Sequence, residues 1–346
     1  MRKFIMTRAF ETCRSALVQA EWLKAESALF SAGGRFAAGR IGCAAILTCA
    51  ATGLAIGGSG STPSSSEKEA HVLVVSKWNG DCDASNRTSW DNMLDAWYDD
   101  ITDSGSSPGG HGSKAYVADG FRKNDGVSDD DFCDEDVVDW GADTGDGDVD
   151  EGDAVFIGLH GSEGSTSSDW YGSMHTDCSG TDGTDCNCTA WQGEMRLGDS
   201  DLEFLHMSSC FSLDDEDWDE WDVTFEGLHQ VNGFAGIMWI STTYNGRYSG
   251  FSDDAFDIAI AEAWLDNQYS GGFWTGGNDH CPVSMAAGLS ESDVEDRIAD
   301  EEYDYVFSDP DNPTDFCVIW IGGCDAKDEA ALPTCGGAWE CDEINP

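Results

Sequence analysis

Two short apolar segments of the chain each run directly into a chemically reactive residue. The first, residues 154–159, precedes His160, and the second, residues 202–209, precedes Cys210. Apolar runs of this length, bounded by acidic and Gly/Ser-rich sequence, are typical of buried strands in a parallel sheet. Open α/β sheets place their chemistry just beyond the carboxyl ends of such strands. We therefore expect His160 and Cys210 to face each other.

The rest of the pattern alternates strands with helices from residue 71 to about residue 321. Strands are expected at residues 71–76, 114–118, 154–159, 202–210, 233–241, 281–289 and 316–321. Helices are expected at residues 90–101, 215–229 and 251–265, with a short one starting at Ser290. Apolar residues recur at three- and four-residue steps in the first of these helices. This alternation predicts one α/β domain with a mainly parallel sheet.

The first 60 residues have the order of an export signal. Seven basic and three acidic residues fall within residues 1–40, and an apolar stretch then extends from Ile41 to about Ile56. This run of about 16 residues is shorter than the roughly 20 that a membrane span needs. We expect a cleaved signal peptide, a secreted or cell-surface protein, and no stable membrane insertion after the signal is removed.

The expected organisation after residue 60 has three parts. A Ser/Gly/Pro-containing linker covers residues 61–70, and the main domain covers residues 71–325. A Cys-rich insertion is expected within that domain at residues 162–198, and a Cys-containing tail at residues 326–346.

The formal net charge of the 346-residue chain is −50. Nucleic acids and anionic membrane surfaces are therefore excluded as expected partners, because their phosphates would be repelled. Such an excess of acid is typical of a protein that works in a saline medium, binds cations, or does both. Calcium is the expected ion, in a structural role, with Asp146, Asp148 and Asp150 of a Gly-containing loop as candidate ligands. No cofactor is required for the expected chemistry.

Cysteine parity separates one residue from the others. Three of the 14 cysteines lie in the export region, and setting Cys210 aside leaves an even set of ten. An exported chain with such a set is expected to form up to five disulfides. The ten residues are Cys82, Cys133, Cys178, Cys186, Cys188, Cys281, Cys317, Cys324, Cys335 and Cys341.

Local disulfide candidates join Cys335 to Cys341, and Cys178 to either Cys186 or Cys188. Zinc bound by His175 together with Cys178, Cys186 and Cys188 is the competing use of that cluster. The oxidising environment favours disulfides.

The expected chemistry follows from the pairing of a thiol with an imidazole. A cysteine is only a few per cent thiolate at neutral pH, so a nucleophilic Cys210 needs a base such as His160. Gly161 has no side chain, and its backbone N–H could therefore reach a tetrahedral oxyanion, with the N–H of Cys210 as the second donor. Ser162 and Ser209 are candidate substrate contacts beside the pair. The helix expected after Cys210 would add its dipole, opposed by acidic residues at its start.

These residues resemble the caspase-fold cysteine peptidases, the group that holds caspases, legumains, gingipains and separases. The triplet His160-Gly161-Ser162 looks most like that of legumains, and Ser209-Cys210 stands where the family has Ala/Ser-Cys. His160 precedes Cys210 by about 50 residues, as the histidine of caspases does. The segment 225–234 is similar to one in uncharacterised prokaryotic proteins with this fold.

The resemblance implies a three-layer fold, with a mainly parallel central sheet flanked by helices. It also implies a secreted cysteine endopeptidase that acts on a peptide or protein substrate through a thioester, with Cys210 as nucleophile and His160 as general base and acid. The chain lacks the caspase sequence Gln-Ala-Cys-x-Gly, which leaves specificity open. Arg247 would suit an acidic substrate side chain, and Asp253 and Asp254 a basic one.

Two other functions remain open at this point. The chain could be a non-catalytic protein of the same fold that binds partners through its acidic surface, because one fold hosts both active and inactive members. It could also be an acidic, calcium-binding extracellular structural protein in which the His/Cys pair is accidental.

Overall fold

The computed structural model describes residues 67–78, 84–106, 109–145, 147–163, 170–174, 188–214, 218–271, 278–327 and 340–343. They belong to one unit, Thr62–Pro346. The expected export signal lies outside the described residues, as do Asp146 and His175. So do four of the ten framework cysteines, namely Cys82, Cys178, Cys186 and Cys335.

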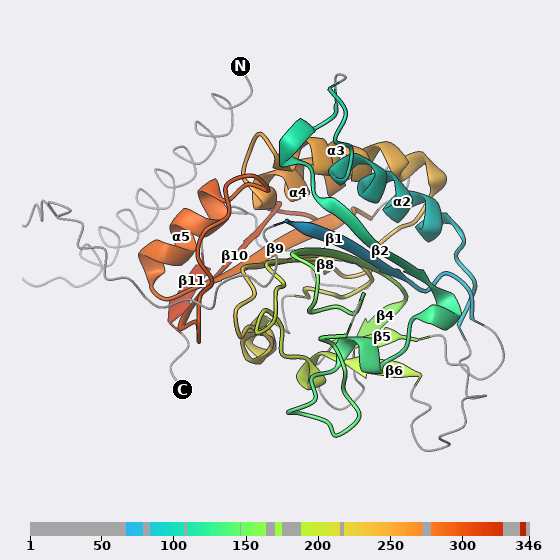
Figure 1. Ribbon diagram of the computed structural model, residues 1–346, viewed down its shortest axis with the longest axis horizontal. Coiled ribbons are helices and arrows are strands. Elements are labelled where there is room, and N and C mark those ends of the chain that lie inside the picture. Colours follow the sequence, from blue (N-terminus) through green and yellow to red (C-terminus); the bar gives the residue numbers. More distant parts are fainter. Residues whose placement is uncertain are drawn as a thin grey trace, which may run out of the picture. The chain divides into compact units, whose positions relative to one another are not determined.

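A large mixed sheet forms the centre of this unit (Figure 1). Its strand order is β11-β10-β9-β8-β7-β3-β1-β2, and the five strands from β2 to β8 are parallel. Strands β9, β10 and β11 extend the sheet in antiparallel fashion. The strands are β1 (Glu69–Val74), β2 (Val117–Lys123), β3 (Ala154–Gly158), β7 (Phe204–Ser208), β8 (Gln230–Ala235), β9 (Cys281–Gly288), β10 (Asp315–Trp320) and β11 (Glu340–Glu343). The expected mixed α/β class with a large, mainly parallel sheet is confirmed.

A second sheet lies after β3. It contains β4 (Gly161–Glu163), β5 (Trp170–Ser173) and β6 (Thr189–Trp191), joined in antiparallel fashion. Helices α2, α3 and α4 cover one face of the large sheet, and the small sheet lies towards the other face (Figure 1). Helix α5 packs against α4, β9 and β10. The helices are α2 (Ser89–Ile101), α3 (Asn245–Ala255), α4 (Ile260–Gln268) and α5 (Glu291–Asp300).

The prediction of an α-helix at residues 215–229 is wrong. Within the described part of this segment, Trp218–Thr224 form a 3-10 helix and the residues that follow form no helix. Side chains three residues apart lie in one line along a 3-10 helix, and Trp218 and Trp221 have that spacing. An α-helix would also concentrate the many like charges of this acidic segment on its surface, which disfavours it.

The single helix expected at residues 251–265 is two helices, α3 and α4. Helix α3 ends at Ala255, whose carbonyl accepts a hydrogen bond from the backbone N–H of Tyr303. Ala259 then takes an extended conformation before α4 begins. The second strand also differs from expectation, because β2 begins at Val117 instead of Lys114. The chain at residues 112–114 forms a 3-10 turn.

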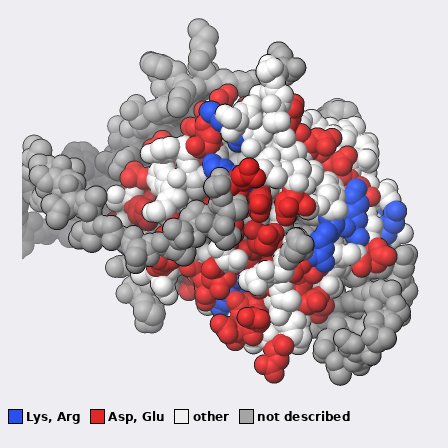
Figure 2. Space-filling model, in the orientation of Figure 1, with Lys and Arg blue, Asp and Glu red and all other residues white. Residues whose placement is uncertain are grey.

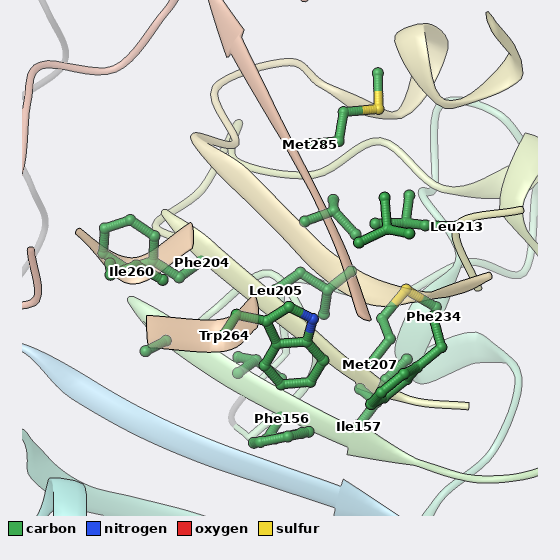
Figure 3. Packing of buried hydrophobic residues seen from close by; sticks show 14 of the residues in the cluster. Phe156, Ile157, Phe204, Leu205, Met207, Leu213, Phe234, Ile260, Trp264 and Met285 are labelled. Carbon is green, nitrogen blue, oxygen red and sulfur yellow. The ribbon is translucent and has the colours of Figure 1, made fainter. Parts of the chain in front are cut away.

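Apolar side chains of β3 and β7 fill the core. Every residue of both strands is buried, as their sequences predict. Trp264 of α4 lies over Phe156, with the ring centres 5.9 Å apart (Figure 3). It also packs on Phe234 of β8 at 5.2 Å and donates its indole N–H to the Gly233 carbonyl at 3.0 Å. Each such aromatic contributes about 1.5–3 kcal/mol by burial, so the central strands are firmly fixed.

The cysteines divide into bonded and free residues. Cys281 and Cys324 form a disulfide, and Cys188 and Cys317 are also disulfide-bonded. Cys210 is free, as expected. Cys133 is also free, so its expected place in the disulfide framework is wrong. Its thiol is buried and donates to the Glu194 carboxylate at 3.8 Å.

Acidic residues cover much of the face shown in Figure 2, and the basic residues gather in a few places on it. This distribution agrees with the net charge of the sequence. None of the helices in the described part of the chain combines the length and the apolar composition that a membrane crossing requires.

Candidate active site

The sheet register places His160 and Cys210 at matching positions. Gly158, the last residue of β3, lies opposite Ser208, the last residue of β7. His160 and Cys210 each follow two residues later, on adjacent parallel strands that are about 4.8 Å apart. The backbone N–H of Leu159 donates to the Ser208 carbonyl at 3.4 Å, so the pairing continues past the end of the strands.

Gly161 lies directly against the residues around the cysteine. A Cβ atom added there would be 2.2 Å from Ser209 Oγ, 2.3 Å from the Cys210 carbonyl oxygen and 2.4 Å from the Trp170 indole nitrogen. That indole N–H donates to the same Cys210 carbonyl at 3.2 Å. The glycine therefore has a steric role: it lets the segment after β3 approach the backbone of Cys210.

His160 is oriented by a loop that follows β1. Its Nε2 lies 2.9 Å from the carbonyl oxygen of Ser85. Because a carbonyl oxygen only accepts hydrogen bonds, Nε2 carries the proton and Nδ1 has the free lone pair of a base. The ring packs on Trp78 at 4.7 Å and against Trp90 at 5.1 Å between ring centres.

The surroundings of His160 favour its neutral form. Burial lowers the pKa of the imidazole, the Ser85 carbonyl raises it, and the positive charge of Arg87 lowers it again. The net shift is downward. The imidazole is therefore available as a base near neutral pH.

Cys210 is held as a protonated thiol. Burial raises its pKa, and the Met238 backbone and the charges of Arg87 and Lys327 lower it by less. The Sγ atom donates to the Met238 carbonyl at 3.7 Å. The contribution expected from a helix dipole is not available, because the following segment forms no α-helix in its described part.

A strained turn follows the cysteine. Phe211 has a φ angle of 55°, in the left-handed region that non-glycine residues rarely adopt. Its backbone N–H donates to the Gly236 carbonyl at 2.8 Å. This bond ties the turn to the segment after β8, which also supplies the Met238 carbonyl. Strain of this kind is found where the surrounding structure holds a functional residue in place.

The candidate substrate contacts lie in different surroundings. Ser162 is half-buried in β4, and Ser209 is buried with its Oγ facing Gly161. Arg247 donates from Nη1 to the carbonyls of Asn267 at 3.1 Å and Tyr269 at 2.6 Å, at the end of α4. Its guanidinium thus has a structural use, and its role in specificity stays a prediction.

The acidic residues proposed to select a basic side chain lie on α3. Asp253 is exposed, and Asp254 accepts a hydrogen bond from Asn267 Nδ2 at 2.8 Å. Their role in specificity stays a prediction as well.

Two of the calcium candidates have protein partners. Asp148 forms an ion pair with Arg122. Asp150 is buried, and it accepts hydrogen bonds from the backbone N–H groups of Gly198 and of Ser200, the latter at 2.9 Å. These donors use carboxylate oxygens that a calcium ion would need.

Several residues around the site were not predicted from the sequence. Ser85 and Met238 act through backbone carbonyls, which any residue supplies, so their identity gives no signal. Trp78 and Trp90 pack on His160, and Trp90 also donates to Ser208 Oγ at 3.0 Å. The helical pattern predicted Trp90 as a core residue, without indicating which ring it would touch.

Two carboxylate–histidine clusters were also missed. One contains Glu69, His71, Asp119 and Glu151, and the other contains Asp100, His111 and Asp253. Within each cluster, one ligand atom from every residue lies within 4.8 Å of the others.

Fold and site together define an α/β protein with an oriented histidine and a free cysteine at the carboxyl ends of adjacent parallel strands. The chain belongs to the family described as a domain of unknown function, DUF6345, whose sequence profile matches residues 111–322. The match covers more than half of the chain and includes both His160 and Cys210. No curated protein matches the chain.

Proposed function

We propose that this protein is a cysteine endopeptidase with a caspase-like arrangement, in which His160 and Cys210 form the catalytic pair. The register between β3 and β7 is the observation that carries the proposal, since it brings both residues to the same end of neighbouring strands. The position of the pair at the carboxyl ends of parallel strands adds support, because α/β sheets place their sites there.

The hydrogen bond from His160 to Ser85 supports the assignment of roles. A catalytic base is normally oriented by a third group, and the Ser85 carbonyl fixes which ring nitrogen of His160 takes the proton. The lowered pKa of His160 and the raised pKa of Cys210 both favour neutral groups. The resting pair is then a thiol beside an imidazole, and the proton moves during attack.

The proposed reaction has two halves. Sγ of Cys210 turns from the Met238 carbonyl and bonds to the substrate carbonyl carbon, while its proton passes to Nδ1 of His160. The N–H groups of Gly161 and Cys210 stabilise the oxyanion. The imidazolium then protonates the leaving amine, which departs and leaves a thioester on Cys210. A water molecule activated by His160 hydrolyses this thioester and restores the thiol.

A peptidase assay on the full chain tests the proposal. The parent is expected to cleave members of a pooled fluorogenic peptide library in saline buffer. Cys210→Ala and His160→Ala should remove this cleavage, whereas Cys133→Ala, which changes the other described free cysteine, should keep it. Unfolding curves of all variants establish that they are folded.

Alkylation gives a second measurement that does not depend on finding a substrate. Native protein treated with iodoacetamide should be modified at Cys210 and protected at buried Cys133. Because the resting thiol is protonated, the rate should rise steadily into alkaline pH, without a plateau between about pH 6 and 7. No cleavage together with no modification of Cys210 would overturn the proposal in favour of a binding protein.

A further inference from the structure

Four ionisable side chains gather at the amino-terminal ends of three neighbouring strands. Glu69 and His71 lie two residues apart on β1 and so share one face of the strand. Asp119 comes from β2, and Glu151 from the turn before β3. Their ligand atoms all lie within 4.8 Å of one another.

His71 is the unusual member of the cluster. Its side chain is 0% exposed, and its Nε2 lies 2.9 Å from Asp119 Oδ2 and 3.3 Å from Glu151 Oε2. Neither approach has the geometry of a hydrogen bond, and neither ring nitrogen has a hydrogen-bond partner in the described part of the chain. Burying an unpartnered ring nitrogen is costly. Nε2 nevertheless lies near two carboxylates, and a single N–H group cannot donate a well-aligned hydrogen bond to both.

The backbone is adapted to this arrangement. Ala70 pairs with Ala118 and His71 with Gly120, so Asp119 is an extra residue that bulges from β2. A bulge redirects a side chain, and bulges are common next to functional sites.

Glycine also makes room for the ring. A Cβ at Gly152 would lie 2.8 Å from the His71 ring carbons Cγ and Cδ2, so only glycine fits beside the imidazole.

We propose that Glu69, His71, Asp119 and Glu151 bind a divalent first-row transition metal ion, with zinc as the expected ion. Ligands placed about 2.0–2.1 Å from zinc at tetrahedral angles are themselves roughly 3.3–3.4 Å apart. The distance of 3.3 Å from His71 Nε2 to Glu151 Oε2 matches this value, and the 2.9 Å to Asp119 Oδ2 is a few tenths of an ångström shorter. An imidazole nitrogen suits zinc and disfavours magnesium and calcium, which take oxygen ligands. The ion would give His71 Nε2 the partner that it lacks.

The charges of the cluster favour a cation. Three carboxylates around one imidazole repel one another, and a divalent ion offsets that repulsion. Asp119 and Glu151 have side chains 35% and 30% exposed, so an ion can reach the site from solvent.

The site is separate from the proposed catalytic pair. His71 lies opposite Val155, near the start of β3, whereas His160 follows the end of that strand. An ion held here would tie the edge strand β2 to β1 and to the turn before β3. Its role would be structural, and it does not depend on peptidase activity.

Metal binding by the full chain is the test. Protein stripped with a chelator is dialysed against zinc chloride in saline buffer with excess calcium, which occupies weak carboxylate sites. Bound zinc is then measured by elemental analysis, and affinity by calorimetry. Asp119→Asn and Glu151→Gln keep the side-chain shape at partly exposed positions, and each should lower zinc affinity at least about 100-fold. His71→Gln should do the same if it folds.

The second cluster supplies the control. Asp253 is exposed and belongs to the separate cluster with Asp100 and His111, so Asp253→Asn should leave the zinc affinity of the His71 cluster unchanged. Equal zinc affinity in the parent, D119N and E151Q would overturn the proposal. So would loss of binding in D253N alone. Absence of stoichiometric zinc in the folded parent would also overturn it.

Discussion

Substituting Gly161 with alanine tests the close approach on which the candidate site depends. The new Cβ would lie 2.3 Å from the Cys210 carbonyl oxygen, where an ordinary contact needs about 1 Å more. The carbonyl belongs to the backbone, so relief requires the segments after β3 and β7 to move apart. Gly161→Ala should therefore destabilise the fold even though it adds only one methyl group.

The expected cost has two parts. Overpacking by a methyl group costs about 1–3 kcal/mol. Moving the Cys210 carbonyl also weakens its hydrogen bond from the Trp170 indole, which contributes about 0.5–1.5 kcal/mol. The free energy of unfolding should thus fall by about 1.5–4.5 kcal/mol.

Urea unfolding with disulfides intact measures this difference. Gly246→Ala in α3 is the matched control, because a Cβ there meets no atom within 4 Å beyond the helix's own backbone. It should raise stability by about 0.5–1 kcal/mol, as alanine replaces glycine in a helix. If G161A unfolds within about 0.5 kcal/mol of the parent, the two strand ends do not meet as described, and the register argument for the site is lost.

Two further predictions concern buried carboxylates. Glu301 accepts hydrogen bonds from His229 at 2.7 Å and Arg297 at 3.1 Å, and these groups hold its pKa low although burial acts to raise it. Glu301→Gln should lower the free energy of unfolding by about 3–5 kcal/mol at pH 7. Urea titrations should show this difference from the parent shrinking as pH falls through the pKa of folded Glu301. A difference that stays constant with pH would contradict the prediction. Burial, followed by the charges of Asp134 and Asp199, raises the pKa of Asp143 to about 7, so the fold loses stability as pH rises from the ordinary pKa of an aspartate to about 7. Asp143→Asn should therefore stabilise the protein by about 1 kcal/mol at pH 8 and by less at pH 5. Thermal unfolding at the two pH values measures this, and an equal rise in Tm at both would contradict the prediction.

Apolar patterning was sufficient to predict the part of the fold that holds His160 and Cys210. Residues 154–159 contain no polar side chain, and Leu202, Phe204, Leu205 and Met207 make residues 202–209 largely apolar. Short apolar segments of this kind are typical of strands at the centre of a parallel sheet. Two strands that end in reactive residues then bring those residues together, because parallel strands end at the same edge. The acidic segment after Cys210 was predicted less well, since neither its charge nor its aromatic spacing distinguishes an α-helix from a 3-10 helix over so few residues.

The remaining features depend on contacts that no local pattern encodes. The orientation of His160 is set by a backbone carbonyl, and a carbonyl has the same chemistry whichever residue bears it. His71 was predicted only as the start of a strand, because nothing nearby in the sequence reveals that a bulge in β2 would turn Asp119 towards it. Both cases require knowledge of which strands are neighbours and where their register shifts. The sequence pattern therefore indicates which residues are reactive, and the register decides which of them can act together.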